Sequence, residues 1–202
     1  TGGMYDQLGG GFARYSTDEK WLIPHFEKML YDQGTLVPAY LDAWRITGDE
    51  FYARIARETC DYLLRERRVA EGGFRASTDA DSEGEEGLFF VWNPTTIRDA
   101  LLPRGDDALS KEEQEDLEAA LELALRAYGV DDHGNFEHDG NSALTRWSAL
   151  DAQEESELKG IRQRLLDARN LRVHPGDDDK VLTAWNGLAI SALAQAGRML
   201  GD

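Results

Sequence analysis

Helical patterns fill most of this chain, and one loop-like stretch interrupts them. Apolar residues recur at the spacing of a helix face in six segments, and glycine, proline or capping residues mark the segment ends. The expected helices span residues 24–46, 50–67, 93–102, 111–128, 152–169 and 179–199. The stretch 71–92 is rich in Gly and Asx residues and closes on the β-type run LFFVW. The pattern therefore predicts an all-α fold with one small β-hairpin near residues 73–92 and no larger sheet.

The last expected helix resembles the first. Aligning the GD at 48–49 with the GD at 201–202 shifts the register by 153 residues, and six of the 18 positions from 32 to 49 then match. The matched pairs are Gly34/Gly187, Ala39/Ala192, Ala43/Ala196, Arg45/Arg198, Gly48/Gly201 and Asp49/Asp202. Small residues recur where helices would approach closely, which indicates a repeated helical hairpin. We expect a piece of a longer helical protein, because the chain stops at the turn where a further helix would begin.

Length and charge restrict the class of protein. A chain of 202 residues fits one domain with one substantial core. Its 39 acidic and 22 basic residues give a net charge of −17, which repels nucleic acid and anionic membranes, so we expect neither as a partner. No apolar run approaches the ~20 residues of a membrane helix, and the N-terminus lacks a signal-peptide pattern. Two explanations of the charge remain open: a very soluble acidic surface, or a surface suited to a salt-rich, halophilic cytoplasm.

The single cysteine, Cys60, lies on the apolar stripe of an expected helix. One cysteine excludes an internal disulfide and a cysteine-built zinc site. Because it lies on an apolar stripe, we expect a buried, inert thiol. A lone thiol suits a reducing compartment, which favours a cytoplasmic location. The sequence contains no GxGxxG, P-loop or GxSxG motif, and we predict neither a cofactor nor a metal.

Reactive side chains crowd into the segment PHFEKMLYDQ, residues 24–33. On a helix that begins near Pro24, a histidine, a lysine and an aspartate would share one side, and a glutamate and a tyrosine would form a second pair. These residues are His25, Lys28 and Asp32, and then Glu27 and Tyr31. A histidine beside carboxylates can transfer protons near neutral pH. The alternative is a hydrogen-bonded helix start with ordinary side-chain pairs.

Acidic residues also gather in DADSEGEEG, residues 79–87, where Asp79, Asp81 and Glu86 are the candidates for catalysis. The stretch nearly fits a calcium loop, but the twelfth position holds Phe90 where that loop needs glutamate. Paired carboxylates can instead perform acid–base chemistry on a glycosidic bond. A solvated acidic turn is the other explanation.

A third candidate is DDDKVLTAWNG, residues 177–187, which places polar and aromatic groups near a helix start. Its candidate substrate-binding residues are Lys180, Trp185 and Asn186. In the repeat register, Trp185 and Asn186 take the places of Asp32 and Gln33. Sugar rings stack well on flat aromatic faces, so further side chains are candidates for the walls of a sugar pocket. These are Tyr15, Trp21, Tyr31, Trp92 and, again, Trp185.

Four stretches together resemble the signature segments of a known family. They are GGMYDQLGGGFARYSTDEKWLIPHFEKMLYDQ, GGFRASTDADSEGEEGLFFVW, GNFE and DDDKVLTAWNGLAISALA. The chain resembles the YyaL-like family of spermatogenesis-associated, thioredoxin-domain-containing proteins. The resemblance implies a thioredoxin-like domain followed by an (α/α)6 toroid similar to six-hairpin glycosidases and N-acylglucosamine 2-epimerases. This chain has no Cys-x-x-Cys and about half the helices of a toroid. We therefore expect residues 1–202 to be a truncated toroid domain, without the thioredoxin-like domain and the remaining hairpins.

Two classes of function follow from these features. The first is a carbohydrate-active site for hydrolysis or epimerisation, in which His25 faces a carboxylate from the loop 79–87 and an aromatic wall. The second is a non-catalytic helical module that binds a partner or supports a thioredoxin-like domain. Converging carboxylates, histidine and aromatic rings would favour the first. We also expect self-association of the chain, because half a toroid leaves apolar helix faces uncovered.

Overall fold

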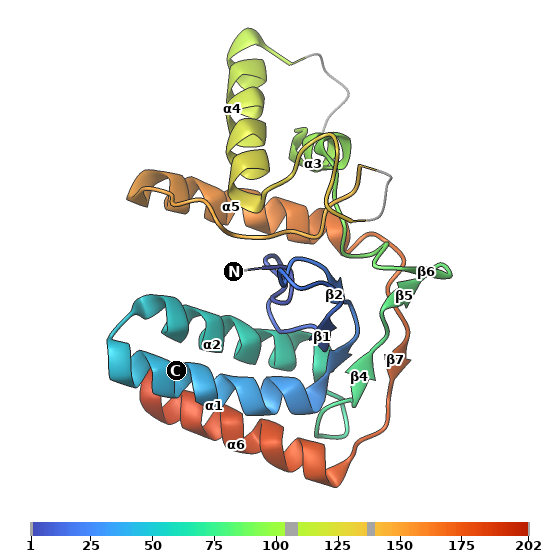
Figure 1. Cartoon of the computed structure of the whole chain (residues 1–202), viewed down its shortest axis with the longest axis vertical. Coiled ribbons are helices and arrows are strands. Elements are labelled where there is room, and N and C mark those ends of the chain that lie inside the picture. The colour runs from blue at the N-terminus through green and yellow to red at the C-terminus, as the bar shows by residue number, and fades with distance from the viewer. Residues whose placement is uncertain (1, 104–108, 137–139, 202) are drawn as a thin grey trace. The chain divides into compact units, whose positions relative to one another are not determined.

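The structure, a computed structural model, describes residues 2–103, 109–136 and 140–201 (Figure 1). The contacts divide the chain into two compact units. Unit 1 comprises Thr1–Leu8, Ser16–Pro24 and Gly87–His174, and unit 2 comprises Gly9–Tyr15, His25–Glu86 and Pro175–Asp202. That the two units form one truncated toroid domain stays a prediction.

The described part of the chain is mainly helical, as the sequence patterns predicted. The helices are α1 Leu30–Thr47, α2 Glu50–Tyr62, the π-helical turn η1 Leu63–Arg67, α3 Pro94–Leu101, α4 Lys111–Tyr128, α5 Ala152–Arg169 and α6 Thr183–Leu200. Side-chain caps begin several of these helices. Asp49 accepts a hydrogen bond from the N–H of Phe51, and Asn93 caps α3. Ser110 and Glu113 form a capping box at the start of α4.

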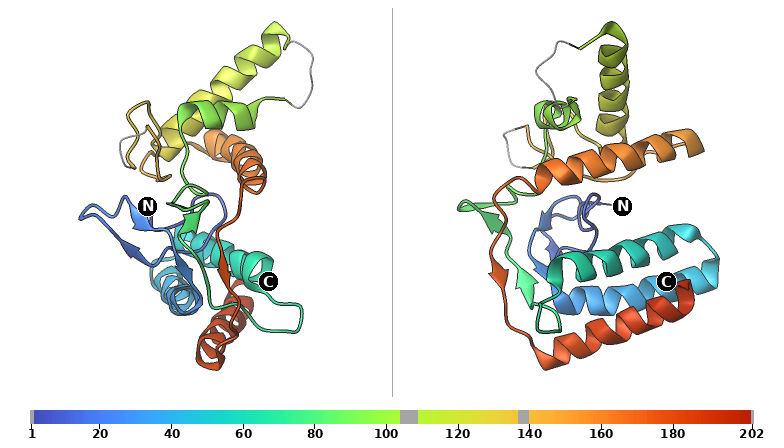
Figure 2. Two further views of the ribbon diagram at one scale, coloured as in Figure 1. Left: turned by 90° about the vertical axis from the view of Figure 1, so that its right-hand side faces the viewer. Right: turned by 180° about the vertical axis from the view of Figure 1, so that it is seen from behind.

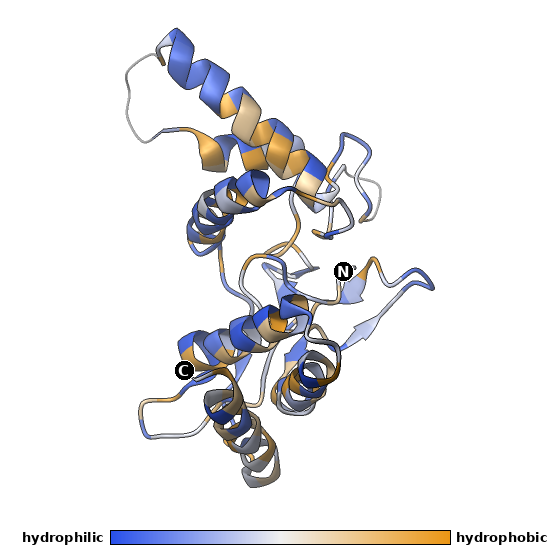
Figure 3. Cartoon of the chain, turned by 90° about the vertical axis from the view of Figure 1, so that its left-hand side faces the viewer, coloured by the Kyte–Doolittle hydropathy of each residue, from blue (hydrophilic) through white to orange (hydrophobic). Residues whose placement is uncertain are grey.

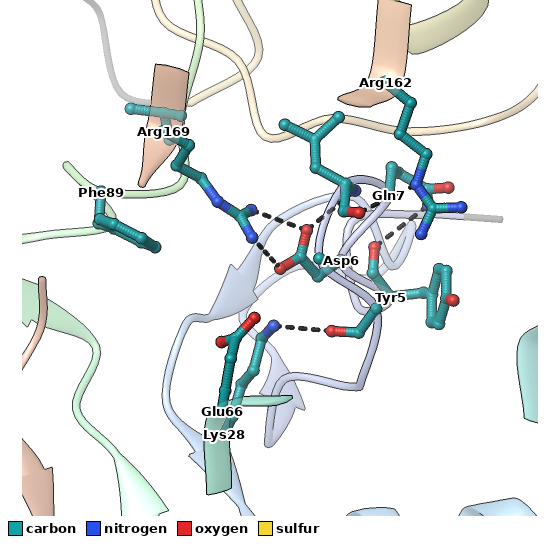
Figure 4. A network of polar contacts seen from close by, with 12 residues as sticks. Tyr5, Asp6, Gln7, Lys28, Glu66, Phe89, Arg162 and Arg169 are labelled. Atoms are coloured by element: carbon teal, nitrogen blue, oxygen red, sulfur yellow. Dashed lines mark hydrogen bonds and ion pairs between the residues drawn. The ribbon is translucent and has the colours of Figure 1, made fainter. Parts of the chain in front are cut away.

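Unit 1 is built on α3, α4 and α5, which share one apolar core. Helix α4 begins with charged residues and becomes apolar in its later turns, so only its second half supplies several core side chains (Figure 3). The N-terminal stretch is held onto α5 by a buried ion pair, in which the Arg169 guanidinium donates to both carboxylate oxygens of Asp6 at 2.8 and 2.9 Å (Figure 4). Arg162 adds a hydrogen bond to the Leu8 carbonyl.

Unit 2 is built on α1, which lies between α2 and α6 (Figure 1 and Figure 2). The approach of α6 requires Gly34, because a Cβ there would stand 2.9 Å from Leu188 Cβ and 3.0 Å from the Ala189 nitrogen. Cys60 is buried in this core, as predicted. Burial, followed by the charge of Asp61, raises the pKa of its thiol to about 11, so the thiol stays protonated and unreactive at neutral pH.

Helices α1 and α6 have the lengths and register of the proposed repeat. Each contains 18 residues, and both ends of α6 lie 153 positions after those of α1. Both helices end at a left-handed glycine, Gly48 with φ 70° and Gly201 with φ 76°. The last matched pair of the repeat includes Asp202, which lies outside the described residues.

The short strands lie in unit 2, except that one residue each of β1 and β2 belongs to unit 1. They are β1 Tyr15–Ser16, β2 Pro24–His25, β3 Lys28–Met29, β4 Ser77–Thr78, β5 Asp81–Ser82, β6 Glu85–Glu86 and β7 Asp177–Asp178. The β5–β6 hairpin lies within the predicted 73–92 region. The prediction of a single hairpin was wrong, because β3, β4 and β7 also form a three-stranded antiparallel sheet. Its strands are two residues long and come from distant parts of the sequence, so no local pattern reveals it.

The same sheet corrects the start of two helices. The first helix begins at Leu30, not near Pro24, because Met29 is extended and the β3 backbone pairs with β4. The last helix begins at Thr183, because the residues before it include β7. Consequently Lys28 does not share a helix face with His25. Its buried ammonium instead donates to the Gly10 carbonyl.

Candidate functional site

A histidine and a loop carboxylate meet in unit 2. His25 Nδ1 lies 2.6 Å from Glu86 Oε1, an ion pair when the ring is protonated. Glu86 reaches this position because the β5–β6 hairpin turns sharply through Glu83 and Gly84, both with positive φ (56° and 86°). The predicted proximity of His25 to the 79–87 loop is therefore observed.

The other edge of the imidazole faces a second carboxylate. His25 Nε2 lies 3.7 Å from Glu27 Oε2, and Arg14 Nη1 donates to that same oxygen at 2.8 Å. A hydrogen bond to Glu27, and next one to Tyr31, raise the pKa of Arg14. Basic and acidic groups thus alternate in the order Arg14, Glu27, His25, Glu86, which fixes the imidazole between two carboxylates.

Tyr15 supports the histidine. The two rings are stacked, with centroids 4.9 Å apart and planes at 24°. One face of the His25 ring is therefore covered, and Tyr15 itself remains half exposed. Tyr15, predicted as a sugar-stacking residue, already contributes one ring face to orienting the imidazole.

Asp32 provides a further titratable carboxyl beside these groups, in the first turn of α1. Burial raises the pKa of Asp32 to about 6; the charge of Arg14 opposes this rise and the charge of Glu27 adds to it. Among the described residues, no hydrogen-bond partner faces its buried Oδ2 atom. Asp32 can therefore gain and lose a proton close to neutral pH.

An aromatic pair adjoins this cluster. Tyr31 at the start of α1 meets Trp185 at the start of α6 edge-on, with centroids 4.9 Å apart and planes at 71°. Because Arg14 hydrogen-bonds Tyr31 as well as Glu27, it connects the aromatic pair to the acidic groups. Arg14 was not among the residues that the sequence patterns predicted. Its one distinguishing feature in the sequence is that no other basic residue stands in the Gly-rich stretch before Lys20.

Two further acidic candidates of the loop have other surroundings. The Asp79 carboxylate accepts hydrogen bonds from the backbone N–H groups of Ala80 at 2.7 Å and Asp81 at 3.3 Å. Asp79 thus holds its own turn. Asp81 is exposed in β5. The described contacts bring Glu86, but neither of these aspartates, to His25.

The other substrate-binding candidates are also used elsewhere. Asn186 is buried, and its amide bonds the backbone of Phe74. The Lys180 ammonium pairs with Asp178 at 2.6 Å. Trp92 belongs to the core of unit 1 and is only 1% exposed. These environments explain the three residues by structural roles.

Trp21 is different, because it is 63% exposed and belongs to unit 1, whereas the His25 cluster belongs to unit 2. Within the described ranges, no group of three or more His, Cys, Asp or Glu side chains has the arrangement of a metal site. A search of the described helices finds none with the length and apolar character needed to cross a membrane.

Comparison with known proteins shows what the chain is similar to. No family model matches the sequence. The whole chain is 36% identical, over 225 residues, to spermatogenesis-associated protein 20 of Homo sapiens, and 37% identical over 224 residues to the protein of that name from Mus musculus. An uncharacterized protein of Caenorhabditis elegans is 33% identical over 222 residues, which cover 96% of this chain. The chain spans 28% of the length of the two mammalian relatives and 29% of the nematode relative.

Proposed function

Because the whole chain is homologous to a part of spermatogenesis-associated protein 20, a member of a thioredoxin-domain-containing family, we propose that unit 2 carries the acid–base site of a carbohydrate-processing domain. The observation that carries the proposal is the position of His25 between Glu86 and Glu27. The substrate is a sugar, and the reaction is hydrolysis or epimerisation.

Both reactions need groups that exchange protons with the substrate. Hydrolysis requires a proton for the leaving oxygen and a base or nucleophile opposite it, and epimerisation requires a proton to be removed from carbon and returned. His25 is one such group, and Glu86 orients it through Nδ1. Asp32 is the second, since its raised pKa, about 6, gives it a substantial protonated fraction near neutrality.

The surroundings of these groups suit a sugar. Tyr31 and Trp185 offer apolar ring surface, against which the C–H face of a pyranose can pack. Arg14, with a half-exposed side chain, has N–H donors beyond the one bonded to Glu27. A few polar groups beside aromatic surface are typical of small-molecule sites.

The alternative is a non-catalytic helical module that binds a partner or supports a thioredoxin-like domain. Asn186 and Trp92 favour this alternative, because the Asn186 amide bonds the backbone of Phe74 and the Trp92 side chain lies in a core. In this alternative, the Arg14–Glu27–His25–Glu86 series only ties the β5–β6 hairpin to the rest of unit 2.

Sugar binding and turnover distinguish the two. We expect glycan-array binding and calorimetry to detect a sugar ligand for the chain, and the His25→Ala variant to lose sugar turnover with little change in melting temperature. His133→Ala is the matched control, because His133 is an exposed histidine of unit 1. Unchanged sugar turnover in His25→Ala, or a large loss of its stability, would assign His25 a structural role and favour the alternative.

A further inference from the structure

An exposed tryptophan of unit 1 stands on an unusual backbone. Trp21 has φ 61°, in the left-handed region that bulky side chains rarely adopt, and its side chain is 63% exposed. This conformation is energetically unfavourable for a residue other than glycine. Burial of the indole does not offset this cost, so other residues must hold the turn in place.

Asp18 is the first of these residues. Its Oδ1 accepts the N–H of Lys20 at 2.7 Å, and its Oδ2 accepts the N–H groups of Leu22 at 3.0 Å and Ile23 at 2.5 Å. These hydrogen bonds, with Ile23 contributing most, lower the pKa of Asp18, so the carboxylate is ionised at neutral pH. One side chain thus fixes the backbone on both sides of Trp21.

Two glycines near the N-terminus also contact the turn. A Cβ at Gly2 would stand 1.9 Å from the Trp21 carbonyl oxygen, and a Cβ at Gly3 would stand 2.0 Å from that of Leu22. Only glycine permits this approach of two backbones. Gly2 and Gly3 therefore let the N-terminal backbone pack directly against the turn, although the side chain that the turn presents faces solvent.

A second exposed indole lies near the same glycine. Trp147 is 65% exposed, and its Cζ2 atom lies 3.7 Å from the Cβ position of Gly2. The residues on each side of Trp147 are anchored, since Arg146 pairs with Glu155 at 2.7 Å and the Ser148 hydroxyl donates to the Arg126 carbonyl at 3.0 Å. Trp21 and Trp147, the indole pair, are therefore two exposed aromatic groups of one unit, each between neighbours that are held by polar contacts.

We propose that the indole pair is a glycan-binding surface of unit 1, which stacks the pyranose rings of a neutral oligosaccharide. An indole combines a flat apolar face with an N–H donor, the combination that a sugar ring and its hydroxyls require. Glu19 and Lys20, both exposed beside Trp21, supply polar partners for the hydroxyls at the rim. The inference rests on the proposed function only for the class of ligand, because it uses neither His25 nor any other residue of unit 2.

Charge decides between a glycan and other ligands. Protein interfaces are depleted of charged residues at their centre, whereas charged side chains adjoin Trp21 here. A net charge of −17 disfavours the stacking of nucleic-acid bases, because their phosphates would be repelled. A neutral glycan encounters neither obstacle.

The test uses Trp21→Asn. Asparagine removes the indole and adopts positive φ more readily than tryptophan, so we expect an unchanged or higher melting temperature. The probes are cellotetraose, maltotetraose and chitotetraose, followed by tryptophan fluorescence and calorimetry. We expect the chain to bind at least one probe, and Trp21→Asn and Trp147→Ala each to weaken that binding about tenfold or more.

His25→Ala is the control that separates the two proposals. Unchanged probe binding by His25→Ala, with loss in Trp21→Asn, supports the indole pair whether or not the His25 site acts on sugars. Loss in His25→Ala with full binding by Trp21→Asn overturns the indole-pair proposal and leaves the proposed function standing. Absence of binding to all three probes also overturns the indole-pair proposal. So does protection of Trp21 from acrylamide quenching that increases with protein concentration and does not respond to the probes, because another copy of the chain would then cover the indole.

Discussion

Gln33 and Asn186 use their side-chain amides in the same way. Gln33 accepts the N–H of Phe12 at 2.7 Å and donates to the carbonyl of the same residue at 2.8 Å. Asn186 accepts the N–H of Phe74 at 2.7 Å and donates to its carbonyl at 3.0 Å. Each amide also donates to the backbone carbonyl four residues earlier. The two residues lie 153 positions apart, the register of the repeat.

This correspondence shows why both residues are amides. Each side chain closes a hydrogen-bonded ring with the backbone of a loop and thereby fixes that loop onto the first turns of a helix. An amide is the side chain that donates and accepts in one plane, as the backbone of the loop requires. The repeat thus preserves a means of attaching loops to helices, even though the two residues differ in length.

The first prediction concerns these amides. Gln33→Met and Asn186→Leu keep the approximate volume but remove the side-chain hydrogen bonds to a buried backbone N–H and carbonyl, so each should lower the free energy of unfolding by about 1–3 kcal/mol. Urea denaturation measures the loss. Gln163→Met, at an exposed position of α5, is the control and should change stability little. Equal stability of the buried and exposed variants would contradict the role given to the amides.

The second prediction concerns pH. The folded protein holds the Asp32 proton up to about pH 6, whereas the ordinary carboxyl pKa is 3.8, so the native state binds more protons between these values. Ionisation of Asp32 therefore lowers the free energy of unfolding as pH rises from about 4 to 6. Above that range this decrease is complete. Asp32→Asn should remove this penalty and stabilise the protein at about pH 7 by roughly 1 kcal/mol, after allowance for solvent screening.

The comparison of Asp32→Asn with the parent chain isolates this carboxyl from others that titrate in the same range. Their difference in unfolding free energy, measured by urea denaturation, should be smaller at about pH 4 than at about pH 7. A difference that does not vary with pH would show that the pKa of Asp32 is the same in the folded and unfolded chains.

The third prediction concerns the contact between His25 and Glu86. Glu86→Gln removes the charge that orients the imidazole but should change the unfolding free energy by less than about 1 kcal/mol, because the pair is partly exposed. Sugar turnover should fall. Glu85→Gln makes the same change of charge one residue earlier on the same hairpin and should leave turnover intact. Equal effects of the two variants would mean that only the overall charge of the hairpin matters.

The fourth prediction concerns self-association, which we propose to involve α6. Leu188 and Ile190 are 40% and 57% exposed on a helix whose only charged residue is Arg198. Such a face can approach another chain with less repulsion than the rest of a surface of charge −17. Analytical ultracentrifugation should show oligomers that increase with protein and salt concentration, and Leu188→Gln with Ile190→Gln should reduce them. Leu171→Gln, at an 82% exposed position of unit 1, is the control.

A monomer at every protein and salt concentration would contradict this prediction. So would an equal loss of oligomers in the Leu171→Gln control, because that result would indicate general stickiness of exposed apolar residues.

The sequence by itself determined the helices and their repetition. The caps at Asp49, Asn93 and Ser110 and the glycines at 48 and 201 form hydrogen bonds or adopt backbone angles that depend only on neighbouring residues. Local physics of this kind leaves a readable pattern, and so the existence and order of the helices could be predicted. The acid–base role of His25 and its neighbours stays a proposal.

The tertiary structure decided which reactive residues meet and which aromatic residues face solvent. Residues 24–29 carry a helical pattern, yet their final part becomes β3, because strand 77–78 supplies backbone partners far along the chain. Strand 177–178 in turn pairs with strand 77–78. His25 meets Glu86 across 61 positions of sequence, and Trp92 is buried while Trp21 is exposed. Such outcomes depend on packing between distant segments, a contribution to the free energy that no local sequence pattern contains.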